Sequence, residues 1–197
     1  MTSNNYHHGD LKTELVAQGI AQLEEHGLAA LSLRKVAKRA GVSQAAPYSH
    51  FKDKRSLLAA VANEGYQRLN QRTAEEAEQD PGSPTMGLGR GYVLFALENP
   101  ALFHLMFSSE VSELINAGDL DESASECYRS LTDGINKQHI DSSHNKDTKD
   151  NKFEAAVAWS LVHGLANLLL EKRISPADFG FGELRLFIDN ILTSYLE

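Results

Sequence analysis

Two serines on either side of a glycine constrain the fold of this chain more than any other feature of its sequence. Ser32 precedes Leu33–Ala40, whose apolar residues recur at helical spacing, and Gly41 can supply the positive φ that ends such a helix. Ser43 precedes a second short segment, Gln44 to about His50. Serine is a favoured residue at the N-cap of a helix. The spacing therefore predicts two short helices joined by a tight turn, as in a helix-turn-helix.

The remainder of the chain is also predicted to be helical. Apolar residues at helical spacing predict a first helix from a cap at Asp10 to a stop at Gly27, and a long helix from Lys54 to about Glu78. The other predicted helices are Met86–Glu98, Pro100–Phe107, Asp121–Gln138, Lys152–Arg173 and Phe181–Leu196. The polar run 139–151 has no apolar period and predicts an exposed connection. Because no segment alternates convincingly in the manner of a strand, we expect an all-α fold.

Length and composition set the domain organisation that we expect. The chain has 197 residues, of which 42% are hydrophobic and 23% charged, which excludes a fibrous or wholly disordered protein. We expect an N-terminal three-helix domain over 1–53 and a C-terminal helical bundle over 54–197, with helix 54–78 linking the two; the residues of the bundle, not the composition, predict its roles in ligand binding and dimerisation. The single cysteine, Cys127, cannot close an intramolecular disulfide, and the polar N-terminus does not resemble a signal peptide. Ala155–Leu170 is shorter than the roughly 20 residues that cross a bilayer, so we expect a cytoplasmic protein with no membrane partner.

Charge is distributed unevenly along the chain. The formal net charge is −8, but residues 1–79 hold ten Lys and Arg against nine Asp and Glu, so the net negative charge lies beyond them. Between Arg34 and Arg55 there are seven basic residues and one acid, Asp53. A local charge of about +6 on an acidic protein is typical of a surface that binds a polyanion, although a solvated helical face would have the same composition.

The helix-turn-helix residues are those that binding to double-stranded DNA requires. An α-helix fits the major groove, and donors at the ends of rigid helices bind phosphates. We predict phosphate contacts from Arg34, Tyr48, His50 and Lys54, and base contacts from the segment that Ser43 caps. The residues predicted to face bases are Gln44, which can pair with adenine, and Ala45, Ala46 and Pro47, which offer apolar contact to thymine methyls.

The same residues resemble a known family. Leu31–Ser43 followed by Ala46–Lys54 is similar to the DNA-binding domain of the tetracycline-repressor (TetR) family in its cap, turn glycine, Tyr-x-His-Phe sequence and following lysine. The stretch Trp159–Leu165 is similar to the Trp-x-x-x-His-Gly sequence of one subgroup of the family's ligand-binding domains, and Asn5–Leu11 also recurs there. Ser49 departs from the pattern, because many relatives have a larger or basic residue there. The resemblance implies a homodimeric bacterial regulator, usually a repressor that a small ligand releases from a palindromic operator.

The C-terminal region offers residues for an effector pocket, because helical bundles bind ligands between facing helices. The candidate pocket residues are Phe95, Phe103, Met106, Phe107, Tyr128, Trp159 and His163. Trp159 and His163 are at i and i+4 on one helical face. The alternative is that His163 is a core histidine bonded to a backbone carbonyl and that the aromatic residues are plain core.

Other functions find less support in the sequence. His139, Asp141, His144 and Asp147 fit no standard metal site, so we expect no metal and no cofactor. No nucleophile–base set or phosphate-binding loop supports an enzyme. A DNA-binding protein whose acidic C-terminal domain docks a protein partner is a further alternative. The apolar surface of Lys152–Arg173 and Phe181–Leu196 exceeds what one chain easily covers, which predicts a homodimer.

Overall fold

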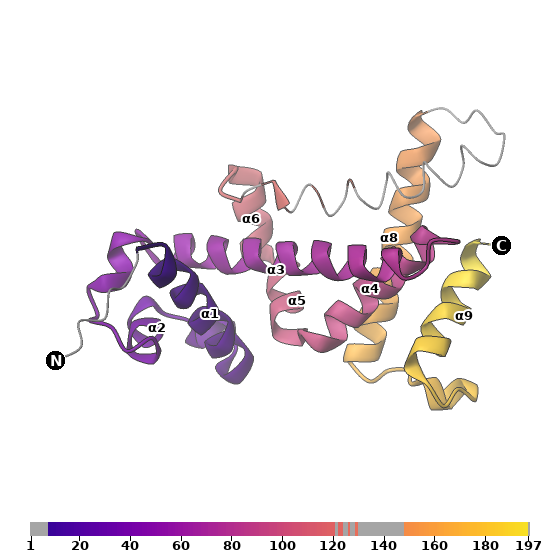
Figure 1. The fold of residues 1–197 in the computed structure, drawn as a ribbon, viewed down its shortest axis with the longest axis horizontal. Helices are drawn as coiled ribbons and strands as arrows, with labels where there is room; N and C mark the ends of the chain where they lie inside the picture. The colour runs from indigo at the N-terminus through magenta and orange to yellow at the C-terminus, as the bar shows by residue number, and fades with distance from the viewer. Residues whose placement is uncertain (1–7, 121, 124–125, 127–128, 130–147, 197) are drawn as a thin grey trace. The chain divides into compact units, whose positions relative to one another are not determined.

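The computed structural model describes residues 8–120, 122–123, 126, 129 and 148–196, and every regular element in this part of the chain is helical (Figure 1). The all-α prediction is therefore confirmed. The described residues of Met1–Tyr66 and Ala101–Asp121 form one compact unit, the head unit, and those of Gln67–Pro100 and Glu122–Glu197 form a second, the bundle unit. The division into domains 1–53 and 54–197 stays a prediction.

The head unit begins with two helices that pack against each other, α1 (His8–His26) and α2 (Leu33–Arg39). Ser32 caps α2 as predicted, because its Oγ accepts a hydrogen bond of 3.3 Å from the backbone N–H of Lys35. Gly27 ends α1 with φ +73°, and Gly41 follows α2 with φ +67°. Both glycines have a positive φ, which other residues rarely adopt. A short 3₁₀-helix, η1 (Leu28–Ala30), joins the two helices.

The second short helix is not the α-helix predicted from Gln44 to His50. It is a 3₁₀-helix, η2 (Ala46–Ser49), preceded by a turn, and its N-cap residue is Ala45 rather than Ser43. Pro47 explains the difference, because it has no N–H to donate to the carbonyl of Ser43. The N–H of Ala46 donates to that carbonyl instead, at 3.0 Å. The segment thereby closes by i→i+3 bonds and is tighter than an α-helix.

A long helix and two shorter ones complete the head unit. The long helix is α3 (Lys54–Glu78), which begins at the residue that the sequence predicts. Its first part, up to Tyr66, belongs to the head unit. α5 (Pro100–Met106) was expected, but α6 (Ser109–Ala117) was not. Ser108 caps α6 through a 3.3 Å hydrogen bond from the N–H of Val111, and Gly118 ends it at φ +74°. The fully buried side chains of the head core include Leu15, Leu31, Leu57, Leu102 and Leu114.

Other helix boundaries differ by a few residues from the predicted ones. α1 starts at His8, so Asp10 lies inside the helix and is not its cap. The C-terminal helices are α4 (Pro84–Glu98), α8 (Thr148–Leu170), η3 (Pro176–Phe179) and α9 (Leu184–Leu196). Most of the helix predicted over 121–138, and residues 139–147 of the predicted connection, lie outside the described residues. The last residues of that connection, 148–151, were predicted wrongly, because they belong to α8.

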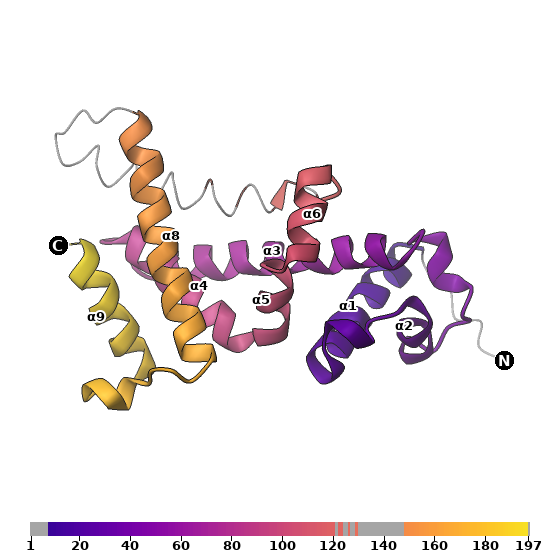
Figure 2. The same cartoon turned by 180° about the vertical axis from the view of Figure 1, so that it is seen from behind.

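In the bundle unit, α4 packs against both α8 and α9 (Figure 2). α4 also lies very close to the second part of α3. A Cβ atom on Gly87 would lie 2.5 Å from the Cα of Ala77, and one on Gly91 would lie 2.7 Å from the Cα of Thr73. Because backbone atoms cannot move aside as a side chain can, these two glycines set the distance between the helices.

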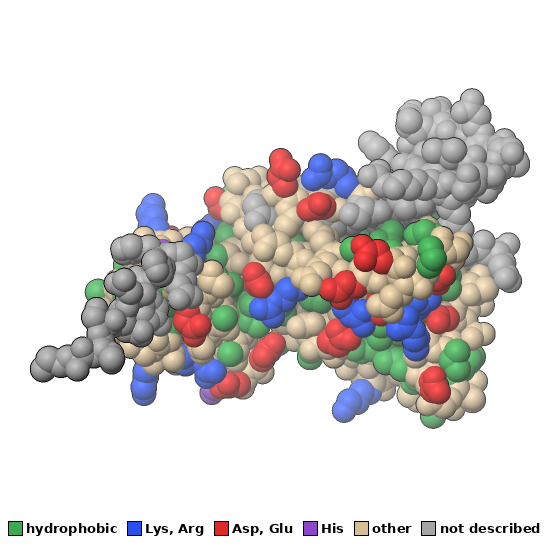
Figure 3. Space-filling model, in the orientation of Figure 1, with side chains coloured by type: hydrophobic (Ala, Val, Ile, Leu, Met, Phe, Trp, Pro, Cys, Tyr) green, Lys and Arg blue, Asp and Glu red, His purple; other side chains and the backbone are tan. Residues whose placement is uncertain are grey.

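A cluster of ion pairs joins α3, α4 and α9 inside the bundle unit. Glu76 is 1% exposed and accepts hydrogen bonds from Arg72, Arg90 and Arg185. Arg90 is also buried and pairs in addition with Asp80 and Asp189, whereas Arg72 pairs with Glu98. Figure 3 shows red and blue side chains lying next to one another over the end of α3. The cluster thus joins the consecutive helices α3 and α4 to α9, which is far from both in the sequence.

The apolar helix α8 remains largely uncovered in the single chain. Its segment Phe153–Leu170 has 18 residues with a mean hydropathy of 1.4, and only 28% of it is buried. By length and composition this segment could cross a membrane, so the sequence-based exclusion on length is not supported. The exposed large side chains on α8 are Phe153, Trp159 and Leu168.

Candidate nucleic-acid interface and ligand site

The turn and η2 present a small exposed surface on the head unit. Gln44 and Ala45 are exposed, and 53% of the Tyr48 side chain is accessible. Ser43 is also exposed, although it does not cap the segment. Pro47 differs from its neighbours because its side chain is buried. The base contact predicted for Pro47 therefore conflicts with its position, and its role is to hold the segment in the tight conformation.

The residues predicted to bind phosphate lie on separate elements of the head unit. Arg34 is exposed at the start of α2, and Lys54 is exposed at the start of α3. The Lys54 Nζ donates to the backbone carbonyl of Leu28, but at 3.4 Å this bond is long. The Nε2 atom of His50 is buried and has no hydrogen-bond partner among the described residues. An acceptor such as a phosphate oxygen would satisfy it if that nitrogen carries the proton.

Two of the seven basic residues are neutralised by acids that the sequence pattern did not connect to them. Arg39 makes two hydrogen bonds to Glu25, of 2.7 and 2.8 Å, which tie α2 to α1. Arg55 makes two to Asp119, of 3.1 and 3.0 Å. These pairs lower the local charge of about +6 that the sequence predicts. The exposed cations left for a polyanion are Arg34, Lys35, Lys38, Lys52 and Lys54.

The predicted effector residues fall into both compact units. Phe103, Met106 and Phe107 belong to the head unit, where the Phe103 and Phe107 rings lie 4.9 Å apart. Met106 packs against Gly65, whose missing side chain leaves room for its sulfur. Its backbone carbonyl accepts a 2.9 Å hydrogen bond from the Tyr66 hydroxyl. These contacts are those of a packed core.

Three other effector candidates, Phe95, Trp159 and His163, belong to the bundle unit, where Tyr92 joins two of them. The Tyr92 hydroxyl lies 2.9 Å from Nδ1 of His163, and Nε1 of Trp159 donates to the same hydroxyl at 3.2 Å. Burial lowers the pKa of His163, which favours the neutral ring that can accept at Nδ1. Phe95 is 1% exposed in this unit.

The sequence pattern did not indicate Tyr92, because it is on α4 and its partners are on α8. No local spacing connects residues that are 67 and 71 positions apart. Tyr128 and the four metal candidates between 139 and 147 lie outside the described residues. Within the described part of the chain, no group of three metal-ligating side chains is found.

Comparison with known proteins gives two family matches and several similar chains. A family model described as bacterial regulatory proteins, tetR family, matches residues 15–61, and one described as the tetracyclin repressor-like C-terminal domain matches residues 85–184. The chain is 36% identical to the tetracycline repressor protein class G of Vibrio anguillarum over 69 residues, which are 35% of this chain and 33% of that protein. It is 28% identical to an HTH-type transcriptional regulator of Mycobacterium bovis over 106 residues, 51% of this chain and 45% of that protein.

The chain thus spans less than half the length of these curated relatives. Similarity to a solved structure extends further. A protein of unknown function from Rhodococcus sp. RHA1 superposes with a TM-score of 0.74 at 28% identity, covering 98% of this chain and 95% of that one. The fold is therefore shared along nearly the whole chain.

Proposed function

The chain belongs to the tetR family of bacterial regulatory proteins, and we propose that it is a cytoplasmic homodimeric repressor that a small molecule releases from a palindromic operator. Family membership supports a transcriptional regulator with a helix-turn-helix. The dimer, the operator, the effector and the location in the cell are the parts that we propose. The observation that carries the proposal is the exposed surface of Gln44, Ala45 and Tyr48 beside the exposed cations of α2 and α3.

We propose that different residues contact the bases and the phosphates of the DNA. Gln44 is exposed on the turn and has the amide that pairs with an adenine edge. Ala45 offers a thymine methyl only apolar contact. Tyr48, His50 and Lys54 donate to phosphates, with Arg34 on the neighbouring helix. Because one amide and small apolar groups discriminate little, DNA shape contributes a large share of the specificity.

We place the proposed dimer interface on the exposed apolar surface of α8 and α9. Trp159 and Leu168 on α8 are 39% and 43% exposed, and Leu186 on α9 is 53% exposed. α8 and α9 both pack on α4, and exposed large apolar side chains on such helices are typical of an interface. A twofold axis would place the two heads in successive major grooves, about 34–36 Å apart, which demands an inverted repeat in the operator. Burial in this interface also explains why α8 has a long apolar segment, without placing the helix in a membrane.

The proposed effector site includes the Tyr92, Trp159 and His163 group of the bundle unit. Its hydroxyl, indole N–H and imidazole supply the few oriented polar atoms that a mostly apolar pocket uses for specificity. An effector that binds more tightly to a conformation in which the two heads do not fit successive major grooves would lower DNA affinity. The loss equals the difference in the effector's binding free energy between the two conformations, typically about 1–3 kcal/mol.

Fluorescence anisotropy tests the proposal. A labelled duplex from the DNA beside the protein's own gene should bind with an affinity that falls steeply with salt, because each neutralised phosphate contributes about −0.9 to the slope of log K against log salt. Lys54→Gln in both subunits should reduce the magnitude of that slope by about 2. No binding to any duplex from this region at low salt would contradict the proposal.

Lys172→Gln is the matched control for the loss of charge. Lys172 is an exposed lysine of the bundle unit and is not among the residues proposed to contact DNA. Its substitution should leave the salt slope unchanged. An equal loss in both variants would show that overall charge, not the proposed phosphate contact, governs binding.

A further inference from the structure

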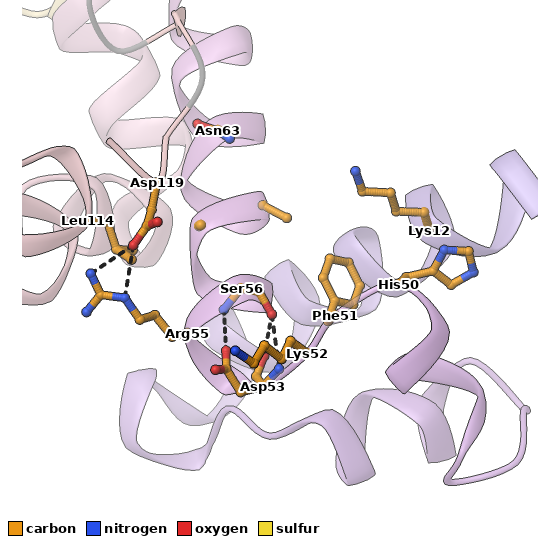
Figure 4. Close-up of a pocket in the computed structure, with 12 residues that line it drawn as sticks. Lys12, His50, Phe51, Lys52, Asp53, Arg55, Ser56, Asn63, Leu114 and Asp119 are labelled. Atoms are coloured by element: carbon orange, nitrogen blue, oxygen red, sulfur yellow. Dashed lines mark hydrogen bonds and ion pairs between the residues drawn. The ribbon is translucent and has the colours of Figure 1, made fainter. Parts of the chain in front are cut away.

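The head unit has a groove that is distinct from the aromatic residues of the predicted effector site. The groove is lined by residues of α1, α3 and α6 and of the segments just before α3 and just after α6, and it has a volume of about 490 Å³ (Figure 4). Cavities that bind small molecules commonly have 300–1,000 Å³. All of its lining residues belong to the head unit, so the groove is complete within one compact part of the chain.

The lining combines an apolar base with charged edges. Phe51, Ala59 and Leu114 form apolar walls that are themselves 2%, 7% and 1% exposed, so they belong to the fixed core. Lys12 and Lys52 are exposed and reach the groove from α1 and from the segment before α3. A groove with rigid apolar walls and cationic edges fits a ligand with a small apolar body and a negative group.

The negative charges already present in the groove have partners. Asp119 accepts both hydrogen bonds from Arg55. Asp53 accepts a 2.9 Å hydrogen bond from the backbone N–H of Ser56, and this bond, together with the nearby charge of Lys52, lowers its pKa. Among the described residues, neither Lys12 nor Lys52 lies within ion-pair distance of an acid, although the charge of Lys52 acts on Asp53 from further away.

His50 also lines the groove, and one polar atom of its side chain is buried. Its Nε2 has no hydrogen-bond partner in the described part of the chain, although a buried polar atom is normally satisfied. As an N–H donor, this atom would suit the oxygen of an anion.

We propose that this groove binds a small organic carboxylate through Lys12, Lys52 and His50, with the apolar body of the ligand against the walls formed by Phe51 and Leu114. His50 is also one of the residues that we propose for phosphate contact. The ligand and the operator therefore compete for the same side chain, and this regulatory consequence rests on the proposed DNA-binding function. The competition is direct and needs no change in the spacing of two heads.

The test is a titration of the full-length protein with benzoate, followed by two-dimensional ¹H–¹⁵N NMR at constant ionic strength. Benzamide serves as the neutral ligand of nearly the same shape, and inorganic phosphate as the anion without an apolar body. Benzoate should shift the amide signals of Phe51, Ser56 and Ala59, and benzamide should not. Lys12→Gln and Lys52→Gln should each weaken benzoate binding about fivefold, the contribution of one good exposed ion pair.

Lys38→Gln is the control variant, because Lys38 is an exposed lysine of α2 in the same unit and does not line the groove. It should bind benzoate as the unsubstituted protein does. Equal shifts with benzamide, or equal affinity in all three lysine variants, would overturn the proposal. Binding of phosphate by the same residues without binding of benzoate would overturn it as well, and would assign the groove to the DNA backbone.

Competition is measured separately, by adding benzoate to the complex with labelled duplex. Benzoate should weaken the duplex affinity of the unsubstituted protein and of Lys38→Gln, and should do so less in Lys12→Gln. A duplex affinity unaffected by saturating benzoate would refute direct competition. Because the NMR titration contains no DNA, failure of the protein to bind any duplex would refute the proposed function and leave the benzoate site to be judged independently.

Discussion

Replacement of Glu76 by glutamine should destabilise the bundle unit strongly. The Glu76 carboxylate accepts hydrogen bonds of 2.6 Å from Arg72, 3.3 Å from Arg90, and 3.2 and 2.6 Å from Arg185. Glutamine keeps one oxygen and loses the charge. Arg90 has a side chain only 7% exposed and cannot turn to water, so the buried positive charge that remains is partly uncompensated.

The size of the stability loss in Glu76→Gln depends on which acidic partners each arginine keeps. Arg90 keeps Asp80 and Asp189, and Arg72 keeps Glu98, whereas the Arg185 side chain is 46% exposed and can be solvated. The loss is therefore below the 3–5 kcal/mol of a fully broken buried pair, at about 2–3 kcal/mol. For a chain of this length, that lowers Tm by about 4–12 °C.

Urea denaturation followed by circular dichroism, at one fixed protein concentration, measures this change. Glu98→Gln is the matched control, because Glu98 also binds Arg72 but is 51% exposed, and it should cost less than about 1 kcal/mol. If Glu76→Gln loses no more stability than Glu98→Gln, the cluster does not hold the bundle unit together as its geometry indicates.

The Glu76 carboxylate should also make the stability of the protein depend on pH. Burial raises the pKa of Glu76, but the hydrogen bonds from Arg72, Arg185 and Arg90 outweigh that effect and hold it below its ordinary 4.5. A carboxyl with a lowered folded-state pKa stabilises the protein above its unfolded-state pKa and stops doing so as pH falls through the folded-state value. Acidification below about pH 4.5 should therefore destabilise the unsubstituted protein more than Glu76→Gln, and parallel acid transitions would contradict this.

Three further substitutions test the local structure. Ser32→Ala removes the N-cap of α2 and should lower the free energy of unfolding by about 1 kcal/mol in urea; an unchanged midpoint would contradict the cap. Gly91→Ala forces a Cβ into the backbone of α3 and should cost about 1–3 kcal/mol, whereas a stabilised variant would show that the helices separate easily. Tyr92→Phe removes the hydroxyl shared by Trp159 and His163, and should cost about 1 kcal/mol and change the fluorescence of the single tryptophan. An unaltered emission spectrum would refute that contact.

The sequence predicts the head unit well where local interactions determine the structure. The Ser32 cap, the turn at Gly41 and the start of α3 at Lys54 each depend on residues a few positions apart. The second short helix was predicted wrongly because one local effect, the missing N–H of Pro47, outweighed the apparent serine cap. α6 was missed because it is a short helix within a largely polar stretch.

Contacts between distant segments could not be predicted from patterns along the chain. Arg90 and Asp189 are 99 positions apart, and Arg55 and Asp119 are 64 apart. The predicted charge of the DNA-binding surface was too high for the same reason, because it counted Arg55 as a cation that could bind a polyanion. Tyr92 is a further example, since its hydroxyl matters only because α4 packs against α8.

Selection of bound sequences from a pool of randomised duplexes tests the central claim most directly. The unsubstituted protein should enrich an inverted repeat whose half-sites are one helical turn apart, with adenine preferred at one position in each half-site. Gln44→Ala should enrich the same repeat without that adenine preference. Enrichment of no inverted repeat, or an adenine preference that persists in Gln44→Ala, would contradict the assignment of this surface as the one that reads DNA.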